Sequence, residues 1–129
     1  MKSTVVKINI LRDCVHTTKL KLNGDRIGID GLASIRHSLR LKKGHKVTPL
    51  KFYLHCHFKS FNGLKPVMFV DDNPMGCGMM LLKIQGNPLC LYGNAIICLK
   101  DNNNGKLVGM NGEQIADMMS AIEVKERRY

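Results

Sequence analysis

The sequence predicts a mainly β (α+β) fold: an antiparallel β-sandwich or partly closed barrel of about eight short strands with a C-terminal helix. Three observations predict it. Short segments of β-branched or alternating apolar residues recur along the chain, turn residues separate them, and helical spacing dominates only near the end. The chain has 129 residues, 44% of them apolar, and no repeat or linker divides it, so we expect a single domain over residues 1–129.

The first elements are two strands and a hairpin. The β-branched run over residues 4–11 predicts a strand. Residues 18–22 alternate and predict a second strand. Asn23-Gly24 follows directly and favours a hairpin turn, because both residues accept positive φ. We expect the returning strand over residues 26–29.

A short helix is predicted over residues 31–43. Apolar residues recur there at helical spacing, and Gly44 is a natural C-terminal stop. The apolar residues from Ile35 to Leu41 also alternate, so a strand is the alternative.

The most regular pattern in the chain lies in residues 50–59. Apolar and polar residues alternate over all ten positions, which predicts a strand with one apolar and one basic face. We expect the apolar face, including Cys56, to point into the core. The outward face carries Lys51, Tyr53, His55, His57 and Lys59.

The second half predicts four more strands. Residues 67–70 form the first, and residues 79–84 and 89–92 flank a turn at Gly86-Asn87-Pro88. The unbroken apolar run over residues 95–99 suits a strand that is buried on both faces.

The end of the chain predicts a helix. Asn111 can cap a helix that extends to about Glu126, with an apolar stripe on one side. Its basic residues come late, which complements the helix dipole.

Positive charge is concentrated in one half of the chain. Residues 1–66 hold fourteen Lys and Arg against three acids, whereas residues 67–129 hold six against seven. No acid lies between Gly31 and Val70. A basic field of this kind attracts polyanions, of which nucleic acid is the commonest. We therefore expect the basic N-terminal half to bind nucleic acid and the near-neutral C-terminal half to self-associate or bind a protein partner.

The expected nucleic-acid-binding surface lies in the acid-free segment. Basic side chains neutralise phosphates, and an exposed tyrosine can stack on a base. Only 5% of the residues are aromatic and none is Trp, so we expect weak sequence specificity and a strong salt dependence. The sequence leaves open RNA or DNA, single or double strand. The predicted residues are Arg36, Arg40, Lys42, Lys43, Lys46, Lys51, Tyr53, His55, His57 and Lys59.

Two alternatives remain open. One is a non-enzymatic protein whose basic face binds an acidic protein partner. The other is a small metal-dependent phosphodiesterase that uses Asp71, Asp72, His55 and His57. No CxxC or HxxxH spacing, Walker loop or dinucleotide motif occurs, so we expect no metal, no cofactor and no catalytic residue. Compact basic β domains also fit viral or phage accessory and packaging proteins, by analogy alone.

Two features of the sequence concern its compartment. The five cysteines are an odd number and widely spaced, which predicts reduced thiols. No apolar run has the length of a signal peptide core or of a membrane span. We therefore expect an intracellular protein of the cytoplasm or nucleus that is neither secreted nor bound to a membrane.

Overall fold

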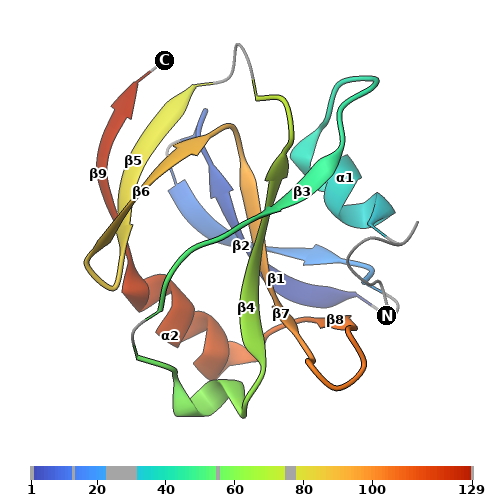
Figure 1. Cartoon of the computed structure of the whole chain (residues 1–129), viewed down its shortest axis with the longest axis vertical. Coiled ribbons are helices and arrows are strands. Elements are labelled where there is room, and N and C mark those ends of the chain that lie inside the picture. Colours follow the sequence, from blue (N-terminus) through green and yellow to red (C-terminus); the bar gives the residue numbers. More distant parts are fainter. Residues whose placement is uncertain (1, 13, 23–31, 55, 75–77, 129) are drawn as a thin grey trace.

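The computed structural model of the chain describes residues 2–12, 14–22, 32–54, 56–74 and 78–128. These residues form two antiparallel sheets and two α-helices (Figure 1). The predicted mainly β, antiparallel fold is therefore confirmed, and the sheets do not close into a barrel.

The larger sheet has the strand order β2-β1-β7-β4-β3, and β8 pairs with β7 beyond this path. β7 lies at its centre, where Ile97 pairs with Val6 of β1 on one side and with Met68 of β4 on the other. Residues 95–99 of β7 are all buried, which confirms the strand predicted from the apolar run. The strands are β1 (Ser3–Asn9), β2 (Cys14–Leu20), β3 (Val47–Leu50), β4 (Lys65–Asp71), β7 (Ala95–Lys100) and β8 (Leu107–Val108).

The smaller sheet has the order β6-β5-β9, with β5 (Met79–Ile84), β6 (Asn87–Tyr92) and β9 (Ile122–Arg128). The predicted β5–β6 hairpin is confirmed, but its turn residues are Gln85 and Gly86, because Asn87 and Pro88 already pair with β5. Gln85 and Gly86 both have positive φ, 49° and 81°, as a two-residue hairpin turn of this twist requires.

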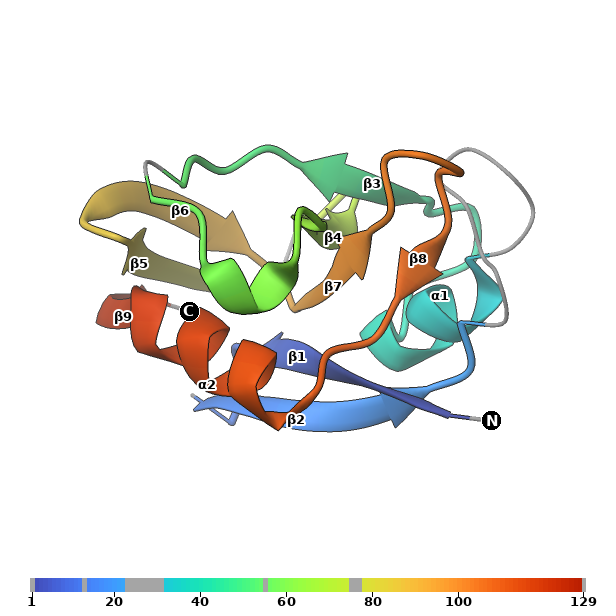
Figure 2. The same ribbon diagram turned by 90° about the horizontal axis from the view of Figure 1, so that it is seen from below.

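The larger sheet buries both of its faces. One face packs against the smaller sheet and α2 (Gly112–Ala121), in a cluster that includes Ile97 and Met118. The other face packs against α1 (Ala33–Leu39), in a cluster that includes Ile35 and Ile96. Figure 2 shows α1 and the smaller sheet at opposite ends of the molecule.

The strand predicted over residues 50–59 is wrong beyond Leu50. β3 ends there, and the chain continues without strand structure to a 3-10 turn at Lys59–Phe61; position 55 lies outside the described residues. The segment leaves β4 and crosses to the β5–β6 turn, where the side-chain amide of Gln85 accepts the Cys56 N–H through its oxygen and donates to the Cys56 carbonyl through its nitrogen. An extended backbone alternates its side chains even without a sheet, so Leu54 is still buried and Tyr53 exposed. Cys56, however, is exposed and does not face the core.

The C-terminal helix is shorter than predicted. Asn111 does cap it: its side chain accepts the backbone N–H of Gln114 at 2.9 Å, and the Gln114 side chain accepts the N–H of Asn111 at 2.8 Å. α2 ends at Ala121, however, and the following residues form β9. The central strand β5 would otherwise leave a row of backbone groups unpaired, and β9 satisfies them. The late basic residues therefore lie in a strand and do not complement the helix dipole.

The N-terminal predictions are partly confirmed. The strand predicted at residues 18–22 is the end of β2, which pairs with β1. The turn at Asn23-Gly24 and the returning strand lie outside the described residues. The predicted short helix is α1, but it ends at Leu39, well before Gly44, and is followed by Arg40 with a φ of 55°. The two-residue β8 was not predicted.

Candidate functional site

Three adjoining hollows surround α1, and together we call them the α1 groove. The first, of about 290 Å³, shares Arg40 and Leu41 with the second, of about 320 Å³. The second shares Ala33 and His37 with the third, of about 340 Å³. The groove therefore follows the helix from the loop after α1 to the end of β2.

The helix places its basic side chains in this groove. Ile35 and Leu39 are one turn apart and buried in the core, so they fix which side of α1 faces inward. The opposite stripe, at i, i+3, i+4 and i+7, holds the residues that line the second hollow. These are Ala33, Arg36, His37 and Arg40.

The groove is strongly basic. Lysines or arginines line each hollow, whereas Asp71 is the single acid among its described lining residues. That acid is bound to a histidine. The groove thus presents a run of positive charge with little neutralisation, which favours binding of a polyanion. Its basic side chains are Lys2, Lys19, Lys21, Arg36, Arg40 and Lys42, with His37 and His45.

Further positive charge lies behind the groove, on β1. The Lys7 ammonium donates to the Ser38 carbonyl at 2.9 Å and is half-buried. Burial lowers the pKa of Lys7 from its ordinary value, and the charges of Arg40 and Arg12 lower it further. The charges of both arginines therefore act on the Lys7 ammonium at this end of the sheet.

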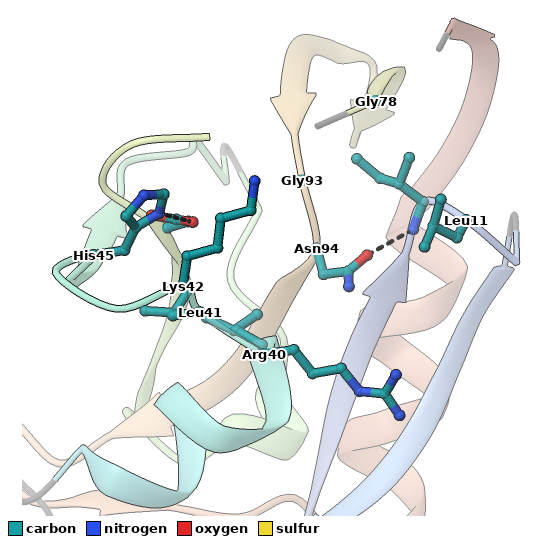
Figure 3. Close-up of a pocket in the computed structure, with 11 residues that line it drawn as sticks. Leu11, Arg40, Leu41, Lys42, His45, Gly78, Gly93 and Asn94 are labelled. Atoms are coloured by element: carbon teal, nitrogen blue, oxygen red, sulfur yellow. Dashed lines mark hydrogen bonds and ion pairs between the residues drawn. The ribbon is translucent and has the colours of Figure 1, made fainter. Parts of the chain in front are cut away.

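The first hollow is a pocket between the loop after α1, the end of β1 and the β6–β7 turn (Figure 3), and we call it the Arg40 pocket. Arg40 extends toward β1, and Lys42 reaches toward Gly93 (Figure 3). Asn94 holds the far wall, where its side-chain oxygen accepts the N–H of Ile10 at 2.9 Å. Leu11 at the rim is 79% exposed, a large exposure for a leucine. The apolar lining is completed by Ile10, Leu39 and Leu41.

His45 and Asp71 form an ion pair in this pocket. The His45 Nδ1–H donates to the carboxylate oxygens of Asp71 at 2.8 and 3.0 Å. Burial raises the pKa of Asp71, but the hydrogen bonds from His45 and from the Asn73 N–H, with the charge of His45, outweigh it. The pKa of Asp71 is therefore below its ordinary value.

The loop that carries His45 is fixed at several points. Asp72 accepts the N–H of Lys46 at 2.9 Å and donates its own N–H to the Lys46 carbonyl at 2.9 Å. Arg36 donates from its guanidinium to the His45 carbonyl. The loop thus joins α1 to the end of β4 and holds one wall of the Arg40 pocket.

Arg40 occupies an unusual backbone conformation. Its φ of 55° and ψ of 49° are left-handed, a region that an L-residue other than Gly, Asn or Asp adopts at a cost of about 1 kcal/mol. The N–H of Arg40 bonds to the His37 carbonyl at 3.1 Å and closes the helix. Because this left-handed residue caps the helix, the Arg40 side chain leaves α1 at the Arg40 pocket.

The structure divides the predicted binding residues between two places. Some of them line the α1 groove, namely Arg36, Arg40 and Lys42, and the next loop exposes Lys43 and Lys46. The segment after β3 leads away from α1 (Figure 1) and exposes Lys51, Tyr53, His57 and Lys59, whereas His55 lies outside the described residues.

Sequence reasoning missed part of the groove. Lys2, Lys19 and Lys21 come from the N-terminal hairpin and become neighbours of α1 only in the fold. The signal available was the alternation of Lys19 and Lys21 along one side of the predicted strand. The pairing of His45 with Asp71 depends on the register of β3 on β4, which no local sequence pattern gives.

Of the four metal ligands considered for a phosphodiesterase, Asp71, Asp72 and His57 are described and His55 is not. Within the described part of the chain, no three His, Cys, Asp or Glu side chains lie close enough to hold a metal ion. Asp71 and Asp72 accept hydrogen bonds from the loop after α1 instead. The described cysteines, Cys14, Cys56, Cys90 and Cys98, form no disulfide with one another. Among the described helices, none has the length and apolar character needed to cross a membrane.

Comparison with models of known protein families, with curated proteins and with solved structures finds no match to the chain.

Proposed function

We propose that the protein binds nucleic acid and contacts its phosphates through the α1 groove. The observation that carries the proposal is the charge of this groove: cations line all three hollows, and the single described acid in its lining is bound to His45. Phosphate backbones are the polyanions that such a surface attracts most strongly, through release of their counterions. The exposed lysines of the 51–59 segment form a second, separate basic surface.

Binding to oligonucleotides at two salt concentrations tests the proposal. If about five phosphates are neutralised, the affinity for a single strand falls about 100-fold between about 50 and about 200 mM salt. Fluorescence anisotropy with labelled single- and double-stranded oligonucleotides measures it. Absence of binding at low salt contradicts the proposal and favours an acidic protein partner. Cleavage that a chelator stops favours the phosphodiesterase.

A pair of double variants tests which surface binds. Lys19→Gln with Lys21→Gln removes two charges from the groove, whereas Lys51→Gln with Lys59→Gln removes two from the separate segment. We expect the first pair to weaken binding and to reduce the salt slope by about two, while the second pair leaves the slope unchanged. All four lysines are exposed, so neither variant removes a buried contact. The reverse result assigns binding to the 51–59 segment.

Self-association through the C-terminal half also stays a proposal. The outer strands of the smaller sheet argue against pairing edge to edge, because β9 is rich in charged residues and β6 contains Pro88. Sedimentation velocity across a range of concentrations measures the oligomeric state.

A further inference from the structure

The Arg40 pocket differs in character from the rest of the groove. The second and third hollows are lined mainly by cations and by small or polar residues, as suits contact with a backbone of phosphates. The Arg40 pocket instead combines cations with four apolar side chains and an asparagine. Its apolar side chains are Ile10, Leu11, Leu39 and Leu41.

The positive charge of the Arg40 pocket favours a ligand with an anionic group. Arg40 and Lys42 have no hydrogen-bonded or ionic partner among the described side chains, and the Asp71 carboxylate is occupied by His45. The charge of Arg40 repels the Lys7 ammonium, as does that of Arg12. An anion bound at Arg40 would reduce this mutual repulsion, and a planar guanidinium matches phosphate oxygens in pairs.

The other walls of the pocket indicate which chemical group of the ligand carries the anion. The leucines provide an apolar surface, and Leu11 at the rim is largely free of contacts in its exposed position. The Asn94 oxygen is used by Ile10, which leaves its amide nitrogen without a partner among the described residues; the nitrogen is turned away from Ile10, toward the Arg40 side (Figure 3). A flat, apolar group whose edge accepts hydrogen bonds satisfies both walls.

From these three features we propose that the Arg40 pocket binds one nucleoside phosphate, with the phosphate at Arg40 and Lys42 and the base between the leucines and Asn94. The volume of about 290 Å³ is at the lower limit of ligand pockets and suits a single nucleotide. A free mononucleotide and one nucleotide of a strand in the groove share this chemistry. Binding of one nucleotide of a strand rests on the nucleic-acid binding proposed above, whereas binding of a free mononucleotide does not.

Titration calorimetry with mononucleotides tests the pocket directly. We expect a nucleoside monophosphate to bind more tightly than inorganic phosphate, which lacks the base, and than the nucleoside, which lacks the phosphate. Equal affinity for inorganic phosphate and the monophosphate overturns the proposal, because the leucines and Asn94 then contribute nothing. Tighter binding of an alkyl phosphate also overturns it in favour of a lipid-like ligand.

Two variants alter the pocket with little cost to folding. Arg40→Asn removes the guanidinium and keeps a residue that accepts the left-handed conformation. Leu11→Ser removes an apolar side chain that is 79% exposed. We expect each to weaken mononucleotide binding by about 10-fold or more, as expected for a lost charge-assisted bond or apolar wall.

Lys65→Gln is the matched control for Arg40→Asn. Lys65 is an exposed cation at the start of β4, whereas Asp71 at the pocket ends the same strand, about 20 Å away. We expect this variant to bind mononucleotide as the unchanged protein does. If Lys65→Gln weakens binding as much as Arg40→Asn, the binding reflects net charge and the pocket proposal is wrong.

The outcomes separate the pocket from the groove. Oligonucleotide binding that loses affinity in Arg40→Asn and Leu11→Ser supports a strand that places one nucleotide in the pocket. Oligonucleotide binding without any mononucleotide binding, and unchanged in Leu11→Ser, overturns the pocket and leaves the groove. Mononucleotide binding without oligonucleotide binding supports the pocket and removes the proposed function of the groove.

Discussion

Asp71 joins two parts of the molecule that are distant in sequence. It ends β4, and through His45 it holds the loop after α1 in place. The side chains of both residues are largely buried, with 12% and 18% exposed, so water competes little for the bond. The geometry of the Arg40 pocket therefore depends on this ion pair.

The charge state of Asp71 makes the pair sensitive to acid. The pKa of Asp71 is lower in the folded protein than its ordinary value of 3.8, so the folded state holds this proton less tightly than the unfolded chain. The resulting stability is fully present above pH 3.8 and is lost as the pH falls through the folded value. We expect Asp71→Asn to lower the free energy of unfolding by about 1–2 kcal/mol at pH 7, and by less as the pH falls below 3.8.

Urea unfolding of both proteins at neutral and acidic pH measures this difference. A difference between the two proteins that stays constant across the pH range would show that the asparagine acts by altering packing and not by removing the charge.

Gln85 has the left-handed backbone that the β5–β6 turn requires, and its side chain binds the segment after β3. Its Oε1 accepts the Cys56 N–H at 3.1 Å and its Nε2 donates to the Cys56 carbonyl at 2.8 Å. Gln85→Gly relieves the left-handed backbone but removes both bonds. These effects are similar in size, so we expect the global stability to change by less than about 1 kcal/mol.

Amide hydrogen exchange at Cys56 detects the loss of these two hydrogen bonds, which the global stability does not reveal. We expect the Cys56 amide hydrogen to exchange at least about 10-fold faster in Gln85→Gly. The amide of residue 85, which donates to the Ala121 carbonyl at 2.9 Å, is the internal control and keeps its protection. An unchanged rate at Cys56 would mean that packing of Leu54 alone holds the segment.

At the level of elements, the junction between β8 and α2 lies very close to β1. A Cβ atom at Gly109 would lie 2.6 Å from the Ser3 Cβ and 3.0 Å from the Thr4 carbonyl oxygen. That carbonyl also accepts the Met110 N–H at 2.8 Å, so β1 cannot withdraw without losing the bond. We expect Gly109→Ala to destabilise the protein by about 2 kcal/mol, measured by thermal unfolding.

Gly112→Ala is the matched control. Gly112 begins α2, and a Cβ there meets no atom within 4 Å. We expect this change to be neutral or to stabilise the helix by up to about 1 kcal/mol. If both variants unfold at the same temperature, the approach of Gly109 to β1 is not tight in solution.

Elements were predictable where one local pattern decided the structure. The unbroken apolar run of β7 and the N-cap of α2 needed no knowledge of neighbours. The end of α2 did need it, because apolar spacing continues to Ile122 while the unpaired edge of β5 draws the chain into β9. Residues 50–59 show the converse: alternation predicts an extended backbone, but only a neighbouring strand makes it a sheet.

At the scale of the whole molecule, the fold places basic residues from separate stretches of the N-terminal half on one surface. The candidate surface combines three stretches: the start and end of the N-terminal hairpin, one face of α1, and the loop that follows. Composition predicted the sign and the half of the chain. It did not predict that Lys19 and Lys21 lie beside α1 while Lys51 and Lys59 lie elsewhere, because that depends on which sheet edge each segment follows.

The place of β7 at the centre of the larger sheet sets the order in which the protein can be assembled during synthesis. β1 and β2 can pair as soon as both have been made, since they are neighbours in sequence. Val6 and Ile8, however, find their other partners only in β7, near the end of the chain. Apolar side chains of the first strand must therefore wait until β7 has been made before they are covered, and such long-range pairing folds slowly. A ribosome-bound chain that stops before residue 95 is expected to be the species most dependent on chaperones.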